Sequence, residues 1–392
     1  MIAGHQRLLS VLALSLFVSA CGGDGSPASP DSPDAGQPKA TAAVIEAPAK
    51  LAIVADWLHR SLSYVDLDKL AAGGATRASI VTATVDLGAY APGPLVVKLT
   101  PDRKKALVSV SAGFFSIPFA GVLVNATDIP TGPGSVLFVD VATGKVEGEL
   151  ATGDSPMGIA FTPDGTRAYV THFTSGDLAV VDVAKRTVIE RFPLGVYPEE
   201  IAFDDTSTVG VLGYSAEGSV AVFSVADIKN TLKDVPFGGD SAGVAFFPGT
   251  KVAFIVQAPN PLVTTSGFSV IDVSNPAAPR VLQDERLPEA PIAYPAIPAK
   301  SRGSVLVPTT VAGRLTLREY KLEGEQAKVS STIDIADASL LAGLGVSFDE
   351  DHTVLIAWPA QRALVAVDLT AKTSRVIPWL EGVAGPADVI IR

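Results

Sequence analysis

Short apolar runs separated by turn residues dominate the chain from residue 51 to its end. The runs are rich in Val, Ile, Leu and Phe, and Pro or Gly interrupts nearly every longer window. Few stretches place apolar residues at the 3.6-residue spacing of an amphipathic helix. Short apolar runs bounded by turn residues are typical of β-strands. The pattern therefore predicts an all-β domain.

Residues 155–195 show this pattern most clearly. An apolar run at 156–161 is followed by a Pro-Asp-Gly turn, a second run at 167–172, a third at 177–183 and a fourth at 187–195. The next stretch, 197–239, repeats the same order of runs and turns. Each stretch therefore predicts a unit of four short strands with a tight turn after the first.

A polar residue ends the third run of most units, and its spacing measures the repeat. These markers are Asp66, Asp140, Asp182, Ser224, Asp272 and Asp368. From Asp140 onward the spacings are 42, 42, 48 and 96 residues, and the last equals two repeats, with the missing mark near Tyr320. An insertion at about 112–133 accounts for the longer first interval. Four strands in a period of about 40–50 residues predict the blades of a β-propeller. We expect the marker aspartates to cap turns.

The segment from Pro156 to His172 resembles the YVTN repeat, with His172 where the family has Asn. The resemblance is closest in 154–195, continues through 196–287 and 344–392, and fades in 289–335. It implies a seven-bladed propeller, a fold that this family shares with lactonases, surface-layer proteins and nitrous-oxide-reductase-like domains.

The two ends of the domain predict how the ring closes. Residues 51–56 match the second strand of a repeat, whereas 386–391 match a first strand. The C-terminal strand is therefore expected to complete the N-terminal blade and to remove an exposed sheet edge. The predicted fold is an all-β, seven-bladed propeller of four-stranded antiparallel blades over residues 49–392. The blades are 51–88 with 386–392, then 92–153, 155–195, 197–239, 241–287, 289–335 and 342–382.

The N-terminus has the layout of a secretory signal. His5 and Arg7 precede an apolar run at 8–18, and small residues precede Cys21, the single cysteine. The run is shorter than the about 20 apolar residues of a spanning helix. Residues 18–21 resemble the lipobox of bacterial lipoproteins. That resemblance implies removal of residues 1–20 and lipidation of Cys21. The alternative is an ordinary signal peptide with a cysteine there by chance.

Residues 21–48 are predicted to form a disordered linker between anchor and domain. Gly, Ser, Pro, Asp and Ala dominate this stretch, so it has too little apolar surface to offset its chain entropy. Gly22 stands where the lipoprotein family's inner-membrane retention signal has Asp. By that resemblance the protein is exported and anchored in the outer membrane. Whether it faces the periplasm or the cell surface is left open.

Composition narrows the classes of partner and cofactor. The chain is 47% hydrophobic, which is ample for a large core, and its formal net charge is −11, or −12 once Arg7 leaves with the signal. Nucleic acid is not expected as a partner, because phosphate binding needs a basic face. A single cysteine also excludes intramolecular disulfides, iron–sulfur clusters, thiolate zinc sites and covalent haem attachment.

Two sets of loops share one face of such a propeller and form the candidate binding face. The turns between second and third strands carry Trp57, His59, Phe114, Phe115, His172, Phe173, Tyr214 and Trp358. The links between blades add carboxylates, among them Asp154, Glu199, Glu200 and Asp240. Aromatic residues are favoured at recognition surfaces. We therefore expect a non-catalytic binding or scaffold module for another envelope protein or a glycan. The alternative for the aromatic residues is packing between blades.

The insertion at 112–133 is unusually apolar for a loop. It contains the apolar runs 114–119 and 121–124. Exposed, it would be a patch that binds a partner. Folded inward, it would cover the mouth of the central channel.

A metal-dependent hydrolase of the lactonase type is the alternative function. Asp154, Glu199, Glu200 and Asp240 are expected at the starts of neighbouring innermost strands, where Ca²⁺ or another divalent ion could bind. His59 and His172 fall on one face and His352 on the other, so three histidines cannot share one metal. No serine-hydrolase elbow or phosphate loop is present. The binding-module interpretation needs no cofactor. A third possibility is a subunit of a secretion or surface-layer assembly.

Overall fold

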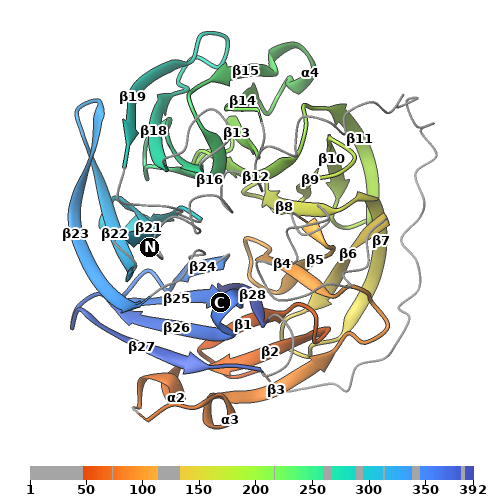
Figure 1. The fold of residues 1–392 in the computed structure, drawn as a ribbon. Helices are drawn as coiled ribbons and strands as arrows, with labels where there is room; N and C mark the ends of the chain where they lie inside the picture. Colours follow the sequence, from red (N-terminus) through yellow and green to blue (C-terminus); the bar gives the residue numbers. More distant parts are fainter. Residues whose placement is uncertain are drawn as a thin grey trace, which may run out of the picture.

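Seven four-stranded antiparallel sheets form a closed ring in the computed structural model (Figure 1). The structure describes residues 47–72, 74–113, 133–215, 217–258, 266–287, 295–311, 314–337, 345–380 and 385–392. Each sheet is one blade, with its first strand near the axis of the ring and its fourth at the rim. The predicted seven-bladed propeller is therefore confirmed.

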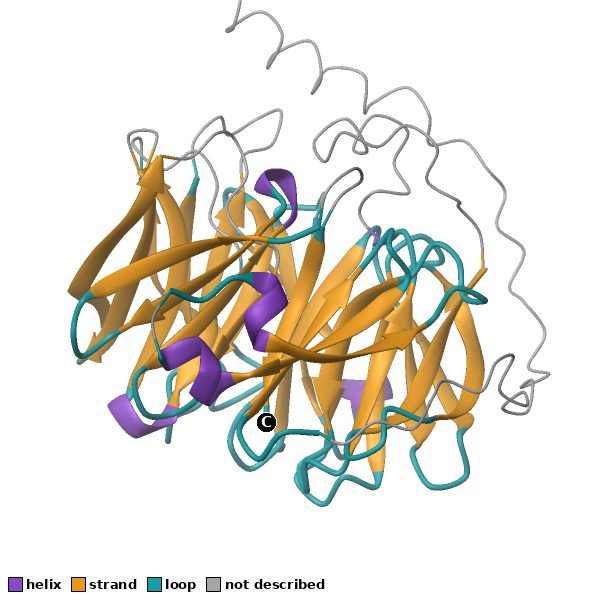
Figure 2. Ribbon diagram, turned by 90° about the horizontal axis from the view of Figure 1, so that it is seen from below, coloured by secondary structure: helices purple, strands orange, loops and turns teal. Residues whose placement is uncertain are grey.

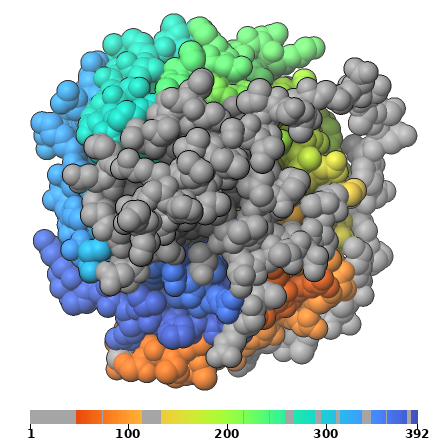
Figure 3. Space-filling view, viewed as in Figure 1, coloured from red at the N-terminus to blue at the C-terminus, as the bar shows by residue number. Residues whose placement is uncertain are grey.

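Blade 1 joins the two ends of the described chain. Its strands, from the axis outward, are β28 (Pro386–Ile391), β1 (Leu51–Asp56), β2 (Ser61–Asp66) and β3 (Val81–Asp86). The antiparallel pairing of β28 with β1 places Val389 opposite Val54. The predicted closure is confirmed. In the space-filling view, the blue surface of blade 7 lies beside the orange surface of blade 1 (Figure 3).

The other six blades follow in chain order. Blade 2 is β4 (Pro94–Leu99), β5 (Lys105–Val110), β6 (Pro133–Asp140) and β7 (Val146–Asp154). Blade 3 is β8 (Pro156–Phe161), β9 (Arg167–His172), β10 (Asp177–Asp182) and β11 (Thr187–Pro193). Blade 4 is β12 (Pro198–Phe203), β13 (Val209–Tyr214), β14 (Ser219–Ser224) and β15 (Lys233–Pro236). Blade 5 is β16 (Asp240–Phe246), β17 (Val252–Ala258), β18 (Gly267–Asp272) and β19 (Arg280–Arg286). Blade 6 is β20 (Ile297–Ala299), β21 (Ser304–Val311), β22 (Arg314–Glu323) and β23 (Gln326–Asp337). Blade 7 is β24 (Gly345–Phe348), β25 (Thr353–Trp358), β26 (Ala363–Asp368) and β27 (Thr373–Pro378).

Short helices interrupt the all-β pattern in a few connections. They are α2 (Leu67–Ala71), α3 (Arg77–Ile80), α4 (Ile228–Thr231) and the 3₁₀ turns η4 (Lys300–Arg302) and η5 (Pro359–Gln361). The side chain of Asp66 caps α2 by accepting the backbone N–H groups of Asp68 and Lys69. Helices of three to five residues are too short to show a periodic apolar pattern, so they could not be predicted from the sequence.

Apolar side chains between neighbouring blades form the core. All six residues of β1 are buried or nearly so, and Leu51 and Ile53 pack in one cluster with Val97 and Val108 of blade 2. Such clusters recur around the ring. The second strand of each blade has sheet neighbours on both sides and blades against both faces, which explains why its sequence is a continuous apolar run.

The marker aspartates cap turns, as predicted. The side chain of Asp140 accepts the backbone N–H of Thr143 at 2.9 Å and its hydroxyl at 2.7 Å. Asp182 accepts the N–H of Lys185 at 2.9 Å, and Asp368 accepts that of Thr370 at 2.8 Å. Their regular spacing therefore reflects one turn repeated from blade to blade.

The side view separates two faces of the ring (Figure 2). One face carries the turns between first and second strands and between third and fourth strands, and we call it the 1–2 face. The opposite face carries the turns between second and third strands and the links between blades, and we call it the 2–3 face. Within the described residues, no helix has the length and apolar character needed to cross a membrane.

Candidate functional site

Most of the predicted aromatic binding face lies inside the ring. Trp57, His172, Phe173, Tyr214 and Trp358 are at most 2% exposed. The indole N–H of Trp57 donates to the backbone carbonyl of Ser111 at 2.9 Å. The ring of Phe173 stacks on that of Tyr197 with centroids 4.7 Å apart. His59 is half-buried, and Phe114 and Phe115 lie outside the described residues, as does Cys21.

The burial of these rings has a structural reason. Each stands at or just after the end of a second strand, where neighbouring strands and the next blade enclose the side chain. The five buried side chains therefore pack the propeller and do not form an exposed surface, which matches the packing alternative for them.

The buried His172 belongs to a polar network of blade 3 that reaches the surface at Arg191. Its Nδ1 lies 3.1 Å from Asp177 Oδ1, and Arg191 Nη1 lies 2.6 Å from Asp177 Oδ2. Burial by itself would raise the pKa of Asp177, but His172 and Arg191 outweigh it and hold the pKa at about 2. A Cβ at Gly153 would lie 2.8 Å from the imidazole Cδ2, so the histidine needs a glycine beside it. This network ties β9, β10 and β11 together.

The four carboxylates expected at one metal site are divided between different surroundings. Asp154 ends β7, the outermost strand of blade 2, and does not begin an innermost strand as expected. Glu199 and Glu200 lie in β12, and Asp240 begins β16. Within the described part of the chain, no group of three or more His, Cys, Asp or Glu side chains is arranged to hold a metal ion.

Burial also changes the acidity of Glu199. Its side chain is 3% exposed, and burial raises its pKa to about 8, with the nearby Glu200 and Asp240 carboxylates adding to the effect. The Ser215 side chain hydrogen-bonds to it and opposes the shift. Glu199 is therefore largely protonated at neutral pH.

Three charged residues on innermost strands form what we call the inner charge cluster, namely Lys98 of blade 2, Glu200 of blade 4 and Asp388 of blade 1. Burial by itself would lower the pKa of Lys98, but the Asp388 and Glu200 carboxylates outweigh it and raise that pKa. Blade 3, which lies between blades 2 and 4, has Gly158 at this level. A Cβ there would lie 2.3 Å from the Glu199 carbonyl oxygen, so only glycine fits.

The carboxylates of this cluster also connect neighbouring blades. Asp388 Oδ2 accepts the backbone N–H of Val97 in blade 2 at 2.9 Å. Glu200 Oε2 accepts that of Val244 in blade 5 at 3.4 Å. These bonds fix the innermost strands relative to one another, so the cluster has a clear structural role.

A groove of about 790 Å³ opens on the 1–2 face between blades 2 and 3. Three turns form it, at 100–105, 162–167 and 182–189. Its lining residues are Thr100, Pro101, Asp102, Lys105, Asp164, Gly165, Thr166, Arg167, Asp182, Val183, Ala184, Lys185, Arg186 and Ile189. All of them belong to turns and strand ends of blades 2 and 3.

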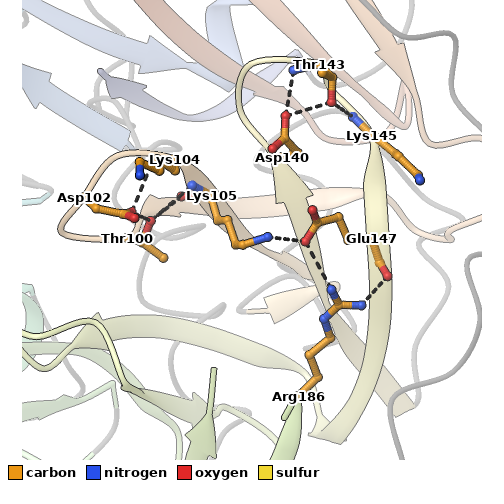
Figure 4. Close-up of polar contacts among 9 residues, drawn as sticks. All are labelled: Thr100, Asp102, Lys104, Lys105, Asp140, Thr143, Lys145, Glu147 and Arg186. Atoms are coloured by element: carbon orange, nitrogen blue, oxygen red, sulfur yellow. Dashed lines mark hydrogen bonds and ion pairs between the residues drawn. The ribbon is translucent and has the colours of Figure 1, made fainter. Parts of the chain in front are cut away.

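One ion pair crosses the boundary between the two blades beside this groove, and a second lies within blade 2 (Figure 4). Glu147 of β7 contacts Lys105 of blade 2, and its Oε2 lies 3.1 Å from Arg186 Nη2 of blade 3. The guanidinium of Arg186 also donates to the Glu147 carbonyl and lies 5.7 Å from the centre of the Phe138 ring. One carboxylate therefore neutralises two cations and holds both at the edge of the groove.

The groove aspartates are tied into their own turns. Hydrogen bonds from the Thr100 hydroxyl and the Lys104 backbone lower the pKa of Asp102, and those from Thr162 and Thr166 lower that of Asp164. Thr100 Oγ1 donates to Asp102 Oδ1 at 2.6 Å, and the same bond in the next blade is 2.6 Å long. Both carboxylates are therefore ionised at neutral pH and directed towards the backbone.

The sequence analysis did not identify this groove, although a signal for it exists. The segments Thr-Pro-Asp-Arg-Lys-Lys at 100–105 and Thr-Pro-Asp-Gly-Thr-Arg at 162–167 place a basic residue at the same position after the same turn. Equivalent turns of adjacent blades lie side by side on one face of a propeller. The repeated basic position therefore marks the groove once the blade order is known.

Comparisons with known proteins give the fold and little else. No protein-family model matches the sequence. The uncharacterized protein YncE of Salmonella typhimurium is 32% identical over 103 residues, and that of Salmonella typhi is 31% identical over 103 residues. Each match covers 26% of this chain and 28% of the relative, so the chain spans little more than a quarter of the curated relatives it matches.

Solved structures of similar shape come from very different proteins. A functionally unknown protein from Desulfotomaculum acetoxidans has a TM-score of 0.64 at 14% identity, covering 88% of this chain and 99% of its own. Kuenenia stuttgartiensis hydrazine synthase has a TM-score of 0.56 at 18% identity over 71% and 77%. The β-propeller domain of Cps50 (Swd1) from Myceliophteria thermophila scores 0.55 at 10% identity over 74% and 87%. At these identities the likeness shows a shared β-propeller fold alone.

Proposed function

We propose that this protein is an exported, lipid-anchored envelope protein whose YVTN-type propeller is a non-catalytic binding module. We further propose that it binds another envelope protein through the groove between blades 2 and 3. The observation that carries the proposal is this groove, because it is an open concavity of about 790 Å³ with charged and apolar residues on its walls. The signal-like N-terminus and Cys21 support export and anchoring.

The chemistry of the groove favours recognition over catalysis. Its carboxylates have lowered pKa values and hold turns, so they are poor proton acceptors at neutral pH. Lys105 and Arg186 are fixed in place by Glu147. Charged groups held rigidly before binding cost little entropy when a partner docks.

A protein partner fits these walls better than a glycan. The glycan hypothesis depended on exposed aromatic rings, and Trp57, Phe173, Tyr214 and Trp358 are buried. In their place the groove offers Ile189, which is 48% exposed, beside ionic side chains. A mixture of apolar and charged groups is typical of protein–protein interfaces.

The start of the described chain supports a partner near the membrane. The backbone N–H of Ala47 donates to the carbonyl of Ala142 at 3.3 Å. Ala142 lies in the turn between β6 and β7 of blade 2, on the 1–2 face. The segment that leads to Cys21 therefore joins the propeller on the face that carries the groove, which favours partners at the same membrane.

Site-specific photo-cross-linking in intact envelopes tests the proposal. A photoreactive phenylalanine at Ala184, an exposed wall residue, is expected to give one discrete adduct with an envelope protein. The matched control is Ala226, the exposed residue at the same position of blade 4. Mass spectrometry of the adduct should map the partner peptide. No adduct at either position, or equal adducts at both, would refute the groove as the binding site.

A further inference from the structure

We propose that the groove between blades 2 and 3 recognises a short acidic segment of its partner protein, in which carboxylates are interspersed with apolar residues. This inference depends on the proposed function and specifies the chemistry of the partner. It is based on the exposed cations of the groove and of the turn beside it, and on the hydrogen bonds that tie the groove carboxylates to their own turns.

The lining contains four cations and three carboxylates. The cations are Lys105, Arg167, Lys185 and Arg186, and the carboxylates are Asp102, Asp164 and Asp182. Glu147 at the edge of the groove contacts Lys105 and Arg186, so the charges of the lining and Glu147 balance. The excess of positive charge comes from Arg103 and Lys104 on the exposed turn of blade 2, in a chain whose formal net charge is −11. A local positive potential steers negatively charged partners towards the groove.

The carboxylates are less available to a ligand than the cations are. Asp164 accepts hydrogen bonds from the Thr162 hydroxyl and from the backbone and hydroxyl of Thr166. Asp182 accepts the backbone N–H of Lys185 at 2.9 Å, and its other oxygen lies 3.1 Å from that residue's ammonium. Their lone pairs are thus directed to their own turns, and little acceptor capacity faces the groove.

The cations keep donors for a ligand. The Lys185 side chain is 76% exposed and makes one ion pair, so two of its three N–H donors remain for a partner. Arg167 is exposed, and its guanidinium lies near the hydroxyl of Tyr169, which is uncharged at neutral pH. In the described part of the chain, no carboxylate oxygen forms an ion pair with Arg167 within 4.0 Å. A guanidinium of this kind binds a carboxylate through two parallel hydrogen bonds.

The apolar surface beside these cations indicates that the ligand also has apolar side chains. Ile189 is 48% exposed, and Pro101 and Val183 contribute further apolar area to the walls. A dense polyanion such as a sulfated glycan would leave these groups without contacts. A peptide with Glu or Asp beside Leu or Ala would satisfy both the donors and the apolar wall, so a peptide is the class that we propose.

Fluorescence anisotropy with the full chain in detergent micelles tests this inference. The probe is a short labelled peptide in which Glu alternates with Leu and Ala, and its counterpart has Gln at every Glu position. The Glu peptide is expected to bind at low salt and the Gln peptide is not. Affinity should fall at least tenfold between about 20 mM and about 500 mM salt, since screening weakens exposed ion pairs.

Charge reversal locates the binding. The variant R167E/K185E loses two attractions and gains two repulsions, which is expected to weaken the Glu peptide about 30-fold. Both side chains are exposed, so the fold should survive. The matched control is K69E/K229E, which changes the net charge equally at exposed lysines of α2 and α4, and it should weaken binding less than about 3-fold.

Three outcomes would overturn the acidic-segment proposal. They are equal binding of the Glu and Gln peptides, equal loss in both charge-reversal variants, and groove-dependent binding of a sulfated oligosaccharide without binding of the peptide. The broader proposal has a separate readout. A discrete adduct at Ala184 with no preference for Glu over Gln would retain the protein-binding groove and refute only its acidic specificity.

Discussion

Replacing Asp56 with Ala tests the packing at the seam where the ring closes. Asp56 ends β1 in blade 1 and is fully buried. Its Oδ1 accepts the indole N–H of Trp379, which follows β27 of blade 7, at 2.5 Å. Its Oδ2 accepts the hydroxyl of Ser63 and lies 4.0 Å from Arg77 Nη2. Arg77 also stacks over the Trp379 ring, 5.3 Å from its centroid. One carboxylate therefore connects the first and last blades.

The expected loss of stability follows from the groups that the substitution leaves behind. Removing the carboxylate strands a buried indole N–H and a buried hydroxyl, at about 1–3 kcal/mol each. It also removes the carboxyl group that lies 4.0 Å from the partly buried Arg77. The two stranded groups together cost about 4 kcal/mol. For a domain of about 350 residues the entropy of unfolding is about 0.7 kcal/mol/K. A loss of about 4 kcal/mol then lowers Tm by about 6 °C.

Differential scanning calorimetry of D56A, D56N and the unchanged protein measures this effect. D56N keeps the shape and one carbonyl acceptor, so it should lose about half as much as D56A. The control is D66A, which removes a helix cap in the same hairpin and should cost about 1 kcal/mol. A Tm of D56A within about 2 °C of the unchanged protein would refute the reasoning, because the seam would then not depend on this carboxylate.

The remaining predictions concern pH and anchoring. Burial raises the pKa of Glu199 to about 8, so the stability that its protonated form contributes is present below about pH 4.5 and is lost as pH rises to about 8. E199Q should therefore flatten the plot of denaturant midpoint against pH between these values. An unchanged slope would contradict this. The pKa of Asp177 is held at about 2, so the stability that its carboxylate contributes is present above about pH 4 and is lost as pH falls through about 2. D177N should lower the free energy of unfolding by about 1–2 kcal/mol at pH 7, and its stability should fall less in acid. Full stability of D177N would argue against the pairing of Asp177 with His172. C21S should abolish acyl labelling and release the protein from membranes, whereas S26A should change neither; persistent acylation of C21S would exclude Cys21 as the anchor.

The repeat made the fold predictable from the sequence. Each blade uses the same order of short strands, and the marker aspartates Asp140, Asp182, Asp272 and Asp368 recur because each caps the same turn. Residues 51–56 read as a second strand, and this alone implied that the C-terminus must supply the missing first strand. Local turn chemistry and the number of repeats are sufficient to specify a ring of this kind.

The candidate site was harder to predict because it depends on directions that a sequence does not carry. Trp57, Tyr214 and Trp358 stand beside turns, and nothing in their spacing tells whether a ring points to solvent or into the next blade. Glu199 and Glu200 are adjacent in sequence, yet one hydrogen-bonds to Ser215 and the other to Val244. Predicting the groove would have required knowing that the turns at 100–105 and 162–167, which are far apart in the sequence, lie beside each other in space.

Hydrogen–deuterium exchange of the full chain with and without the Glu peptide tests the central claim most directly. Binding in the groove predicts slower exchange at 100–105, 162–167 and 182–189 and unchanged exchange in the equivalent turns of blades 4 to 7. Slower exchange confined to the 2–3 face, or protection spread evenly over the blades, would contradict the assignment of the groove between blades 2 and 3 as the binding site.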